Sequence, residues 1–382
     1  MRILMLSYEY PPLGGGGSRV VAGLSAELVR VGHAVDLVTM GFRGLPAHDE
    51  IGGVRVHRVP CLRRDLHTCS APEAATYAAT ALVTAGLLAA RHDYDLVHAH
   101  FIFPDGLVAR VASAVARRPY VITAHGSDVP GYNPDRLHTL HALLAPAWRK
   151  VVGGAAEIVC PSRSLEALLV HQAPDARVSV IPNGIDPWEP VAEDRKRPRR
   201  ILVVTRMLRR KGVQFVLEAL HGEPGDYELN VVGDGPELPA LRGLAAGLDV
   251  NVRFTGWLDN ASPELRELYE TSSVFVLPSE AENFPVVLLE AMAAGLAIVT
   301  SDATGCAEVV GDAAVLVPPR DAGAIKAALR LLFQDDARRR ELGRAARARL
   351  DANYSWPAVG QRYLEVYQRH AGARTRDGEA GT

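Results

Sequence analysis

Residues 274–295 read VFVLPSEAENFPVVLLEAMAAG and combine an apolar run, a polar loop and a helical pattern. The run Val274–Leu277 is typical of a buried parallel strand, and the residues after Pro285 are typical of a helix. A strand, a loop and a helix N-terminus in this order form the place where an open α/β sheet binds its ligand. Glu282 and Glu290 lie on either side of the expected helix start. Carboxylates can bind hydroxyl groups and helix amides can bind phosphate, so a nucleotide sugar would suit this site.

Short apolar runs alternate with helical patterns along the whole chain, which predicts parallel sheets covered by helices on both faces. In the first half we expect strands at Arg2–Leu6, Val35–Thr39, Val54–Val59, Leu96–Ala99, Tyr120–Thr123, Ile158–Cys160 and Val178–Ile181. In the second half we expect them at Ile201–Thr205, Leu229–Val232, Val252–Phe254, Val274–Leu277, Ile298–Thr300 and Val315–Val317. The predicted fold class is therefore α/β, with two doubly wound, Rossmann-like domains.

One break in this alternation divides the chain. Residues 187–200 read PWEPVAEDRKRPRR and carry no apolar period, so we interpret them as an interdomain linker. The predicted domains are residues 1–186 and 201–356. A closing helix is expected at about 357–369, and the small, polar residues 370–382 are expected to form a flexible tail.

The composition of the 382 residues is that of an ordinary globular protein, with 48% apolar and 23% charged residues. A formal net charge of −2 gives no basic field that would favour nucleic acid. The cysteines Cys61, Cys69, Cys160 and Cys306 are scattered, which argues against a disulfide framework or a zinc site and fits a reducing cytoplasm. The stretch Ala74–Ala90 is uncharged but rich in alanine, and we expect a buried or half-buried helix there rather than a membrane span.

Two motifs in the first half follow predicted strands. The loop Gly14–Gly17 comes directly before the first helix, where glycines let the backbone approach a ligand, although a flexible turn would have the same composition. A dinucleotide fingerprint needs a further glycine and an acid at the tip of the second strand, and this sequence has Ser18-Arg19 and Met40 there. His125 follows a strand at the expected ligand edge, but a lone histidine can equally be structural.

Two loops in the second half could bind phosphate. Arg206 and Lys211 follow the first strand of that half, where an arginine fork and a lysine point charge could converge on a diphosphate. Gly233 opens the next strand-to-helix loop, in which backbone could approach a nucleotide. A solvated basic loop and an ordinary turn are the alternative interpretations of these two segments.

Taken in order, these motifs resemble the retaining GT-B glycosyltransferases of family 4, also called group 1 glycosyltransferases. The matching segments are Gly14–Gly17, Gly32-His33, His125-Gly126-Ser127-Asp128, Pro182-Asn183-Gly184-Ile185-Asp186, Arg206 with Lys211-Gly212, Gly233-Asp234-Gly235-Pro236 and Glu282 to Glu290. They span nearly the whole chain, and their ordered set is far more specific than any one of them.

The resemblance implies two Rossmann-like domains that face a cleft, with the last helix crossing back to the first domain. It assigns His125, Arg206, Lys211 and Glu282 to catalysis, with Arg206 and Lys211 on the donor diphosphate and Glu282 on the sugar hydroxyls. The residues implied to bind the donor are Gly15, Gly16, Arg206, Lys211, Gly233, Glu282, Asn283, Phe284, Pro285, Val286 and Glu290, with Glu290 on the ribose.

The sequence departs from the family pattern at three positions. Thr205 replaces a common glycine before the arginine, and Asn283 and Pro285 replace glycines after the first glutamate. Proline has no backbone N–H, so Pro285 removes one amide donor toward the sugar. The acceptor side is less defined by the resemblance, which places Ser18, Arg19 and Asp128 there without naming the acceptor.

The reaction implied is transfer of a hexosyl group from a nucleotide-diphosphate sugar, with UDP or GDP as the nucleotide, to an acceptor hydroxyl. Retention would follow from same-face attack in which a leaving phosphate oxygen takes the acceptor proton. No metal or other cofactor is expected, because Arg206, Lys211 and helix amides would stabilise the leaving group. A double displacement with Glu282 as nucleophile is the rival route.

Other functions on the same architecture stay open at this point. They are a sugar-nucleotide epimerase, a phosphorylase and a non-catalytic nucleotide-sugar binder. A glycan, a lipid carrier or a small metabolite could be the acceptor, and no nucleic-acid partner is expected. Family members with lipid acceptors often dock on membranes through the first domain, so Leu62-Arg63-Arg64 and nearby helices could contact the inner face of a membrane, although a plain surface loop is the alternative. The oligomeric state cannot be predicted from the sequence.

Overall fold

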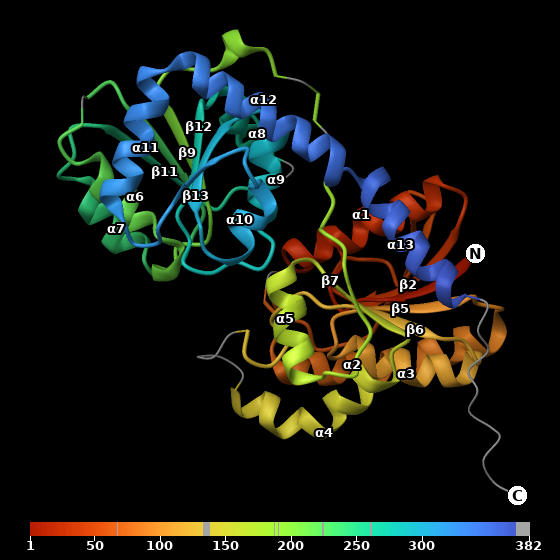
Figure 1. Ribbon diagram of the computed structural model, residues 1–382. Helices are drawn as coiled ribbons and strands as arrows, with labels where there is room; N and C mark the ends of the chain where they lie inside the picture. The colour runs from red at the N-terminus through yellow and green to blue at the C-terminus, as the bar shows by residue number, and fades with distance from the viewer. Residues whose placement is uncertain are drawn as a thin grey trace, which may run out of the picture. The chain divides into compact units, whose positions relative to one another are not determined.

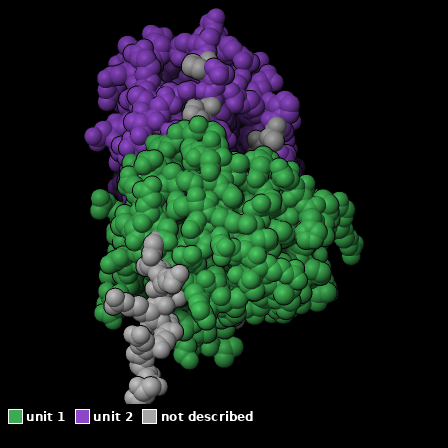
Figure 2. Space-filling view, turned by 90° about the vertical axis from the view of Figure 1, so that its right-hand side faces the viewer, with its two compact units in different colours: residues 1–184, 356–382 green, residues 185–355 purple. Residues whose placement is uncertain are grey.

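The computed structural model describes residues 1–66, 68–132, 138–186, 188–189, 191–223, 225–259 and 262–371, with the backbone alone at 138–141 and 304. The chain forms two compact units, which Figure 2 shows in different colours. Unit 1 comprises residues 1–184 and 356–382, and unit 2 comprises residues 185–355. Each unit has its own sheet and its own buried clusters, as a separate domain should.

Unit 1 is built on a sheet with the strand order β3-β4-β2-β1-β5-β6-β7-β8. The strands are β1 (Arg2–Leu6), β2 (Ala34–Met40), β3 (His48–Ile51), β4 (Val54–Val59), β5 (Leu96–His100), β6 (Tyr120–Thr123), β7 (Glu157–Cys160) and β8 (Val178–Val180). β3 runs antiparallel to β4 and the other neighbouring strands run parallel. The sequence prediction missed β3 because HDEI at this exposed edge contains no apolar run.

Helices cover both faces of the unit 1 sheet (Figure 1). One face carries α2 (Ala71–Arg91), α3 (Asp105–Ala116), α4 (His138–Gly154) and α5 (Arg163–Gln172). The other face carries α1 (Gly16–Arg30) and α13 (Trp356–His370). A side chain on Gly23 of α1 would overlap the Trp356 ring, so this glycine lets the two helices approach closely.

The end of α13 is firmly attached to unit 1. His370 Nε2 lies 2.8 Å from Glu157 Oε2, and the Arg369 guanidinium lies 2.6 Å from Glu157 Oε1. His370, which we assigned to a flexible tail, therefore belongs to the helix, because a buried acid on β7 holds it. Residues 372–382 of the expected tail lie outside the described residues.

Unit 2 is built on a parallel sheet with the strand order β11-β10-β9-β12-β13-β14. The strands are β9 (Arg200–Val204), β10 (Glu228–Val232), β11 (Asn251–Gly256), β12 (Val274–Leu277), β13 (Ala297–Ser301) and β14 (Val315–Val317). On one face lie α6 (Val213–Leu220), α7 (Leu238–Ala245) and α11 (Ala322–Gln334). On the other lie α8 (Pro263–Thr271), α9 (Val286–Ala293) and α10 (Thr304–Val310), while α12 (Asp336–Asn353) contributes to both clusters.

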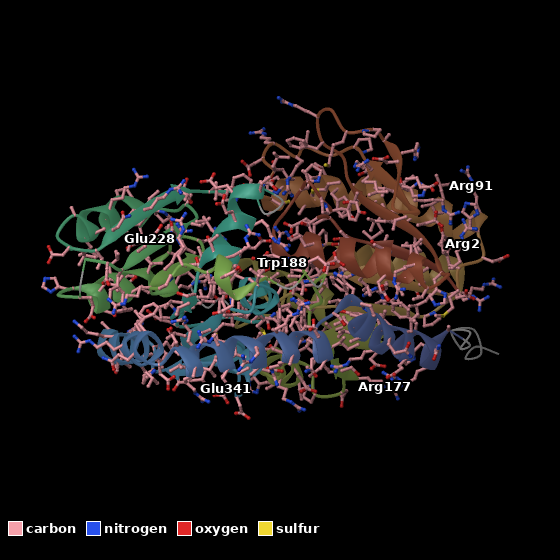
Figure 3. All side chains as sticks on the ribbon, turned by 90° about the horizontal axis from the view of Figure 1, so that it is seen from above. Arg2, Arg91, Arg177, Trp188, Glu228 and Glu341 are labelled. Carbon is pink, nitrogen blue, oxygen red and sulfur yellow. The ribbon has the colours of Figure 1, made fainter. Side chains whose placement is uncertain are left out.

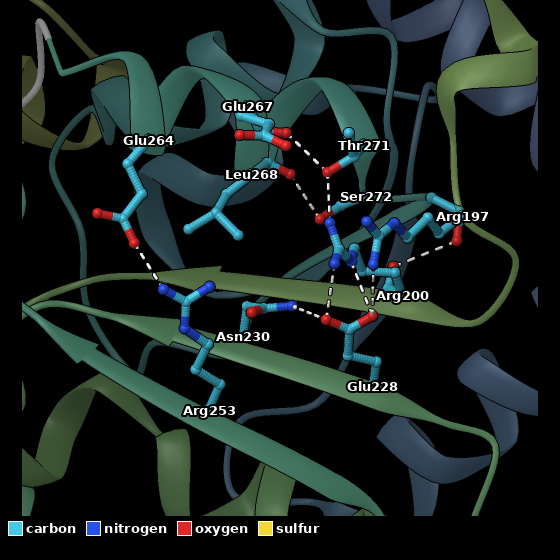
Figure 4. Close-up of polar contacts among 11 residues, drawn as sticks. Arg197, Arg200, Glu228, Asn230, Arg253, Glu264, Glu267, Leu268, Thr271 and Ser272 are labelled. Carbon is cyan, nitrogen blue, oxygen red and sulfur yellow. Dashed lines mark hydrogen bonds and ion pairs between the residues drawn. The ribbon is translucent and has the colours of Figure 1, made fainter.

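The segment 187–200, which we interpreted as a linker, is part of unit 2 in its described residues. It contains the short 3-10 helix η1 (Glu193–Arg195), the Arg197 amide donates to Thr271 O at 2.8 Å, and Arg200 begins β9. The Arg200 guanidinium donates two hydrogen bonds, of 2.9 and 2.8 Å, to Glu228 (Figure 4). One of these contacts is made by the backbone and the other by a charged side chain, so neither depends on an apolar period in the segment.

Candidate active site

The carboxyl ends of β9, β10 and β12 bring three loops of unit 2 together. Gly212 has a φ of 76°, and a Cβ on it would overlap the Pro278 carbonyl oxygen of the loop after β12. Gly233 has a φ of 128°, and a Cβ there would overlap the Thr205 carbonyl oxygen of the loop after β9. Glycine is required at both positions because the backbone is left-handed and the neighbouring chain is in contact. The predicted phosphate loops therefore share one edge of the sheet.

Lys211 and Glu282 form an ion pair at this edge. Lys211 ends the 3-10 helix η2 (Arg209–Lys211), and its ammonium group donates a short hydrogen bond to Glu282 Oε1. The two side chains are 12% and 13% exposed. Lys211, predicted to bind the diphosphate, and Glu282, predicted to bind the sugar, therefore lie side by side and largely out of water.

Glu290 lies inside α9, eight positions after Glu282, and is buried. Its Oε2 accepts a hydrogen bond of 2.7 Å from the Tyr269 hydroxyl, which is itself buried in α8. A hydrogen bond to a carboxylate is among the stronger ones in proteins and also fixes the direction of the acceptor. Tyr269 was not predicted as a site residue, because nothing in the sequence links it to Glu290.

The other predicted donor residues lie on the loops after β9 and β12. The Arg206 side chain is exposed, at the start of the loop after β9. Asn283, Phe284 and Pro285 are buried, and the Phe284 ring packs edge-on against Tyr354 with a centroid distance of 5.6 Å. Pro285 is the N-cap of α9, so the first helical amides begin at Val286. A helix N-terminus of this kind favours an anion.

A further glycine sets the shape of the Glu282 loop. Gly305 lies in α10, and its amide donates to Glu282 O at 3.0 Å. A Cβ on Gly305 would overlap the Asn283 carbonyl oxygen. This close approach holds the loop that carries Glu282, and the sequence prediction missed it because the two segments are more than twenty residues apart.

The glycine-rich loop of unit 1 lies between β1 and α1. Gly15 is the N-cap of α1 and Gly16 its first residue, and both are exposed. The Gly15 amide lies 3.4 Å from Glu9 Oε2. Burial raises the pKa of the Glu9 carboxyl above its usual range. The loop thus presents exposed backbone beside a partly buried acid that the motif did not include.

His125 begins the loop after β6 and joins a cluster of aromatic side chains. His125 Nε2 lies 3.2 Å from His100 Nδ1, and the two rings stack at 28°. The Phe101 ring lies 4.3 Å from the His125 ring, between centroids. His98, two residues before His100 on β5, contacts His100 at 4.3 Å between ring centroids. Burial lowers the pKa of both His98 and His125 to about 3, so they are neutral at pH 7.

The predicted acceptor residues have different surroundings. Asp128 is buried, and its carboxylate accepts hydrogen bonds from the amides of Ile102, His125 and Gly126 at 2.8 to 3.0 Å. Burial raises the pKa of this carboxyl, an effect that the amide hydrogen bonds oppose. The Ser18 hydroxyl donates to Gly15 O at 2.8 Å and Ser18 is buried. The polar atoms of these two side chains therefore shape the His125 loop and the glycine loop.

Asp36 lies inside β2 and not at its tip, and its role here is structural. It is buried in β2, and its carboxylate accepts from Arg55 at 2.7 and 2.8 Å and from the Tyr94 hydroxyl at 2.9 Å. Arg2 adds a contact of 3.1 Å. These hydrogen bonds hold the pKa of the Asp36 carboxyl well below its usual range, in spite of burial, which raises it. The acid is committed to a structural ion-pair cluster.

Two family models match the chain. Residues 14–189 match the model described as Glycosyltransferase Family 4, and residues 185–349 match the one described as Glycosyl transferases group 1. The glycogen synthase of Mycobacterium tuberculosis H37Rv is 34% identical, over 96% of this chain and 94% of that protein. The chain belongs to the group 1 glycosyltransferases of family 4.

Other glycosyltransferases match over a similar length. The alpha-maltose-1-phosphate synthase of Mycolicibacterium smegmatis is 30% identical, over 97% of this chain and 99% of that protein. Sucrose-phosphate synthase from Thermosynechococcus elongatus superposes with a TM-score of 0.80 at 23% identity, over 97% and 98% of the two chains. HepE of Anabaena, solved in complex with UDP and glucose, superposes with a TM-score of 0.73 at 19% identity, over 96% and 99%. The predicted GT-B fold is thereby confirmed.

Within this glycosyltransferase, each unit assembles its own part of the predicted set. Unit 2 brings Lys211, Glu282 and the start of α9 together, and unit 1 brings His125 to the glycine loop. Sequence reasoning missed Phe101 and His100, although His98 and His100 alternate on β5 and so had to share a face. Neither residue belongs to a motif, so their position beside His125 follows only from the fold.

Two general properties of the described residues bear on membranes and metals. Among the described residues, the helix α2 is both long enough and apolar enough to cross a membrane, judged by length and composition alone. Its residues Tyr77, Ala81, Ala85 and Ala89 are buried against the unit 1 sheet. No group of three or more His, Cys, Asp and Glu side chains among the described residues is placed to hold a metal ion.

Proposed function

We propose that this glycosyltransferase moves a hexosyl group from a nucleotide-diphosphate sugar to an acceptor hydroxyl with retention of anomeric configuration. The observation that carries the proposal is the meeting of Lys211 and Glu282 beside the N-terminus of α9. A cation, a carboxylate and helix amides at one edge suit a ligand that has both phosphates and sugar hydroxyls. The buried, hydrogen-bonded Glu290 adds an acceptor for ribose hydroxyls.

The chemistry follows from where charge develops. As the bond between sugar and phosphate stretches, the leaving diphosphate gains negative charge and the sugar becomes cationic in character. Arg206, Lys211 and the first amides of α9 would stabilise the diphosphate, a role in which preorganised donors typically contribute ~3–4 kcal/mol each. The proposal needs no metal, because these groups supply the positive charge.

Unit 1 would supply the acceptor side. Gly15 and Gly16 present exposed backbone, and His125 is held as a neutral imidazole that can hydrogen-bond an uncharged sugar. We propose that a leaving phosphate oxygen takes the proton of the acceptor hydroxyl, since a phosphate oxygen lies next to the reacting carbon in any nucleotide sugar. A double displacement through Glu282 would instead produce a covalent glycosyl adduct on that side chain, which mass spectrometry of a trapped enzyme would detect.

The names of three relatives support a carbohydrate acceptor. Their names describe a glycogen synthase, a maltose-1-phosphate synthase and a sucrose-phosphate synthase. We propose by this similarity that the acceptor is a sugar, a sugar phosphate or a glycan, with a lipid-linked sugar included in the same class. UDP and GDP both remain candidates for the donor nucleotide.

A panel of nucleotide sugars tests the proposed function. Each donor is incubated with the protein, and release of nucleoside diphosphate is followed together with the rise in thermal unfolding temperature. The proposal expects at least one donor to stabilise the protein and to be hydrolysed or transferred, with both effects lost in Lys211→Ala. Interconversion of the free donor sugar would show an epimerase, and phosphate-dependent cleavage of a glycan would show a phosphorylase. Binding without any turnover would show a non-catalytic binder.

We also propose a peripheral membrane contact, on one face of unit 1. The outward stripes of α2 and α3, which lie side by side (Figure 1), expose Val83, Leu87, Val111 and Val115 by 62%, 47%, 41% and 46%. On α2 these side chains alternate with the buried stripe that packs on the sheet, so they point away from it. Leu143 of the neighbouring α4 is 77% exposed. Apolar side chains exposed on adjacent helices are the kind of surface that binds a membrane or a partner.

The charged residues on the same helices favour an anionic lipid surface as the partner of this face. Arg91, Arg110, Arg149 and Lys150 are exposed there, and Figure 3 labels Arg91 at the end of α2. Within α2, α3 and the described side chains of α4, the acidic residues are Glu73 and Asp105, and both are buried. A face with exposed cations and no exposed acid repels its own copy and attracts an anionic lipid surface.

Sedimentation with vesicles of phosphatidylcholine, with and without phosphatidylglycerol, tests this contact. The protein is expected to pellet with the anionic vesicles and to be released by salt. Arg149→Gln with Lys150→Gln removes two charges worth ~1 kcal/mol each, so partitioning should fall on the order of 30-fold. The matched control Arg340→Gln with Arg344→Gln, on exposed positions of α12, should have no effect. Equal loss in both variants, or no pelleting, would contradict the proposal.

A further inference from the structure

The ring of His125 is held between two others. His100 stacks on it with centroids 5.4 Å apart, and Phe101 lies at 4.3 Å and 35°. Phe101 has a φ of 78°, a left-handed conformation that a bulky residue adopts at an energetic cost and that places its ring over His125. The orientation of the His125 ring is therefore set by its neighbours before any ligand binds.

The Nδ1 atom of His125 points toward the glycine-rich loop. A Cβ built on Gly17 would lie 3.6 Å from His125 Nδ1 and 2.9 Å from the end of the Phe101 ring. Any larger residue at position 17 would press on this aromatic pair, so the close approach of the glycine-rich loop to Nδ1 requires glycine there. The other nitrogen, Nε2, faces His100 Nδ1 at 3.2 Å.

The proton between the two histidines can be assigned from the rest of His100. Burial holds the pKa of His100 well below its usual value, so the ring is neutral and carries one N–H. Its Nε2 is fully enclosed and has no hydrogen-bond partner among the described residues. A buried N–H without a partner is rarer in native proteins than a buried acceptor without one. The proton of His100 therefore belongs on Nδ1, where His125 Nε2 can accept it.

We propose that His100 is a positioning residue that fixes His125 as the tautomer with its proton on Nδ1. Because Nε2 of His125 accepts from His100, the single proton of the neutral His125 ring must be on the nitrogen that faces Gly17. His125 then offers a hydrogen-bond donor, and no base, to a ligand oxygen at the glycine-rich loop. The identity of that ligand rests on the proposed function, but the tautomer does not.

The rest of β5 supports this arrangement. His98 Nε2 lies 2.9 Å from Thr123 Oγ1, and its Nδ1 lies 2.7 Å from the Tyr367 hydroxyl of α13. Both nitrogens of His98 are thus engaged away from His100. His98 packs against the His100 ring at 4.3 Å and offers it no proton, so among the described residues His125 is the hydrogen-bond partner that decides the tautomer of His100.

Long-range proton–nitrogen correlation spectra of protein labelled with ¹⁵N-histidine test the proposal directly. The protein contains 13 histidines, and the His125 signals are assigned by their loss in His125→Gln. In the wild type, Nδ1 of His125 should have the shift of a protonated nitrogen and Nε2 that of an unprotonated one. The reverse pattern, or an equal mixture, overturns the proposal, and this result needs no variant of His100.

Two variants separate positioning from packing. His100→Leu removes the donor, and His125 should move toward the tautomer protonated on Nε2. His100→Asn places an amide N–H near the former Nδ1, and it should restore the wild-type pattern. The control His171→Leu replaces an exposed histidine of α5 and should change nothing. If His100→Leu and His100→Asn give the same tautomer, His100 does not set it.

The kinetic readout distinguishes this proposal from the proposed function. On a donor that is turned over, His100→Leu should lower kcat on the order of tenfold while the KM for donor changes little, and His100→Asn should recover most of kcat. If no donor is turned over but the spectra show the expected tautomer, the proposed function fails and the positioning role of His100 stands. If turnover is normal and the tautomer is the opposite one, the positioning role fails alone.

Discussion

The ion pair between Lys211 and Glu282 means that a donor diphosphate must compete with a protein carboxylate for the lysine. Replacing Glu282 by Gln keeps the size of the side chain and removes that competitor. We expect Glu282→Gln to bind free UDP or GDP more tightly than the wild type. We also expect it to turn over the donor sugar more slowly, because an amide binds the sugar hydroxyls less strongly than a carboxylate does. Lys211→Met should both bind the nucleotide more weakly and turn over the donor more slowly than the wild type.

The magnitude follows from the burial of the pair. With side chains 12% and 13% exposed, an effective dielectric constant near 20 is appropriate, and one charge at about 4 Å contributes up to ~4 kcal/mol. The diphosphate would lie farther from Glu282 than Lys211 does, which reduces the repulsion to ~1–2 kcal/mol. The expected gain in nucleotide affinity is therefore roughly five- to thirtyfold. For Lys211→Met, kcat/KM should fall by ~100- to 1,000-fold.

Isothermal titration with UDP and GDP measures the affinities of the wild type, both single variants and the double variant. Glu280→Gln is the matched control, because Glu280 is on the same loop but its carboxylate pairs with Arg320 at 2.5 Å. In this double-mutant cycle, Glu282→Gln should improve nucleotide affinity when residue 211 is lysine and have much less effect when residue 211 is methionine. Unchanged or weaker nucleotide binding by Glu282→Gln would refute the reasoning, as would full affinity in Lys211→Met.

Three further outcomes are expected. Tyr269→Phe removes the hydrogen bond to Glu290, so nucleotide affinity by calorimetry should fall about tenfold, for a loss of ~1.5 kcal/mol; an unchanged affinity would show that Glu290 needs no such partner. Gly305→Ala places a methyl group onto a backbone carbonyl of the Glu282 loop and should lower donor kcat/KM by at least tenfold, with the wild-type near-UV circular dichroism retained; wild-type kinetics would separate Gly305 from the site. His98 and His125 have a folded pKa of about 3 and an unfolded pKa of about 6.5, so the unfolded state binds more protons between these values. The contribution of these histidines to the free energy of unfolding should be fully present above pH 6.5 and fall by up to ~1.4 kcal/mol per histidine for each pH unit below it. A urea unfolding midpoint that stays unchanged from pH 7 to 5 would contradict this.

Much of the fold could be predicted because the buried strands have sequences that are continuous apolar runs. Val274–Leu277 and Tyr120–Thr123 agree with the structure at both ends. β3 could not be predicted in this way, since an exposed edge strand needs no apolar residues. The attachment of the segment 187–200 to unit 2 could not be predicted for a related reason, because it depends on pairs such as Arg200 with Glu228 that hydrophobic periodicity does not record.

The site could be predicted one loop at a time. Each motif follows a strand, and parallel strands place such loops at one edge of a sheet, which is why Lys211 and Glu282 were expected in one region. The sequence does not reveal which side chains touch within that region. Tyr269 against Glu290 and His100 against His125 are contacts between elements about twenty residues apart, and they depend on helix and strand placement. For the same reason, the engagement of Asp128 with backbone amides was not foreseen.

The most direct test of the central claim is the anomeric configuration of the first-formed product. A donor identified in the nucleotide-sugar panel is supplied as its α-anomer, and proton NMR follows the sugar signal before mutarotation, with Lys211→Ala as the inactive control. The account predicts an α-linked product, or α-sugar on hydrolysis, from the wild type alone. A β-configured first product would contradict a retaining transfer at the Lys211 and Glu282 site.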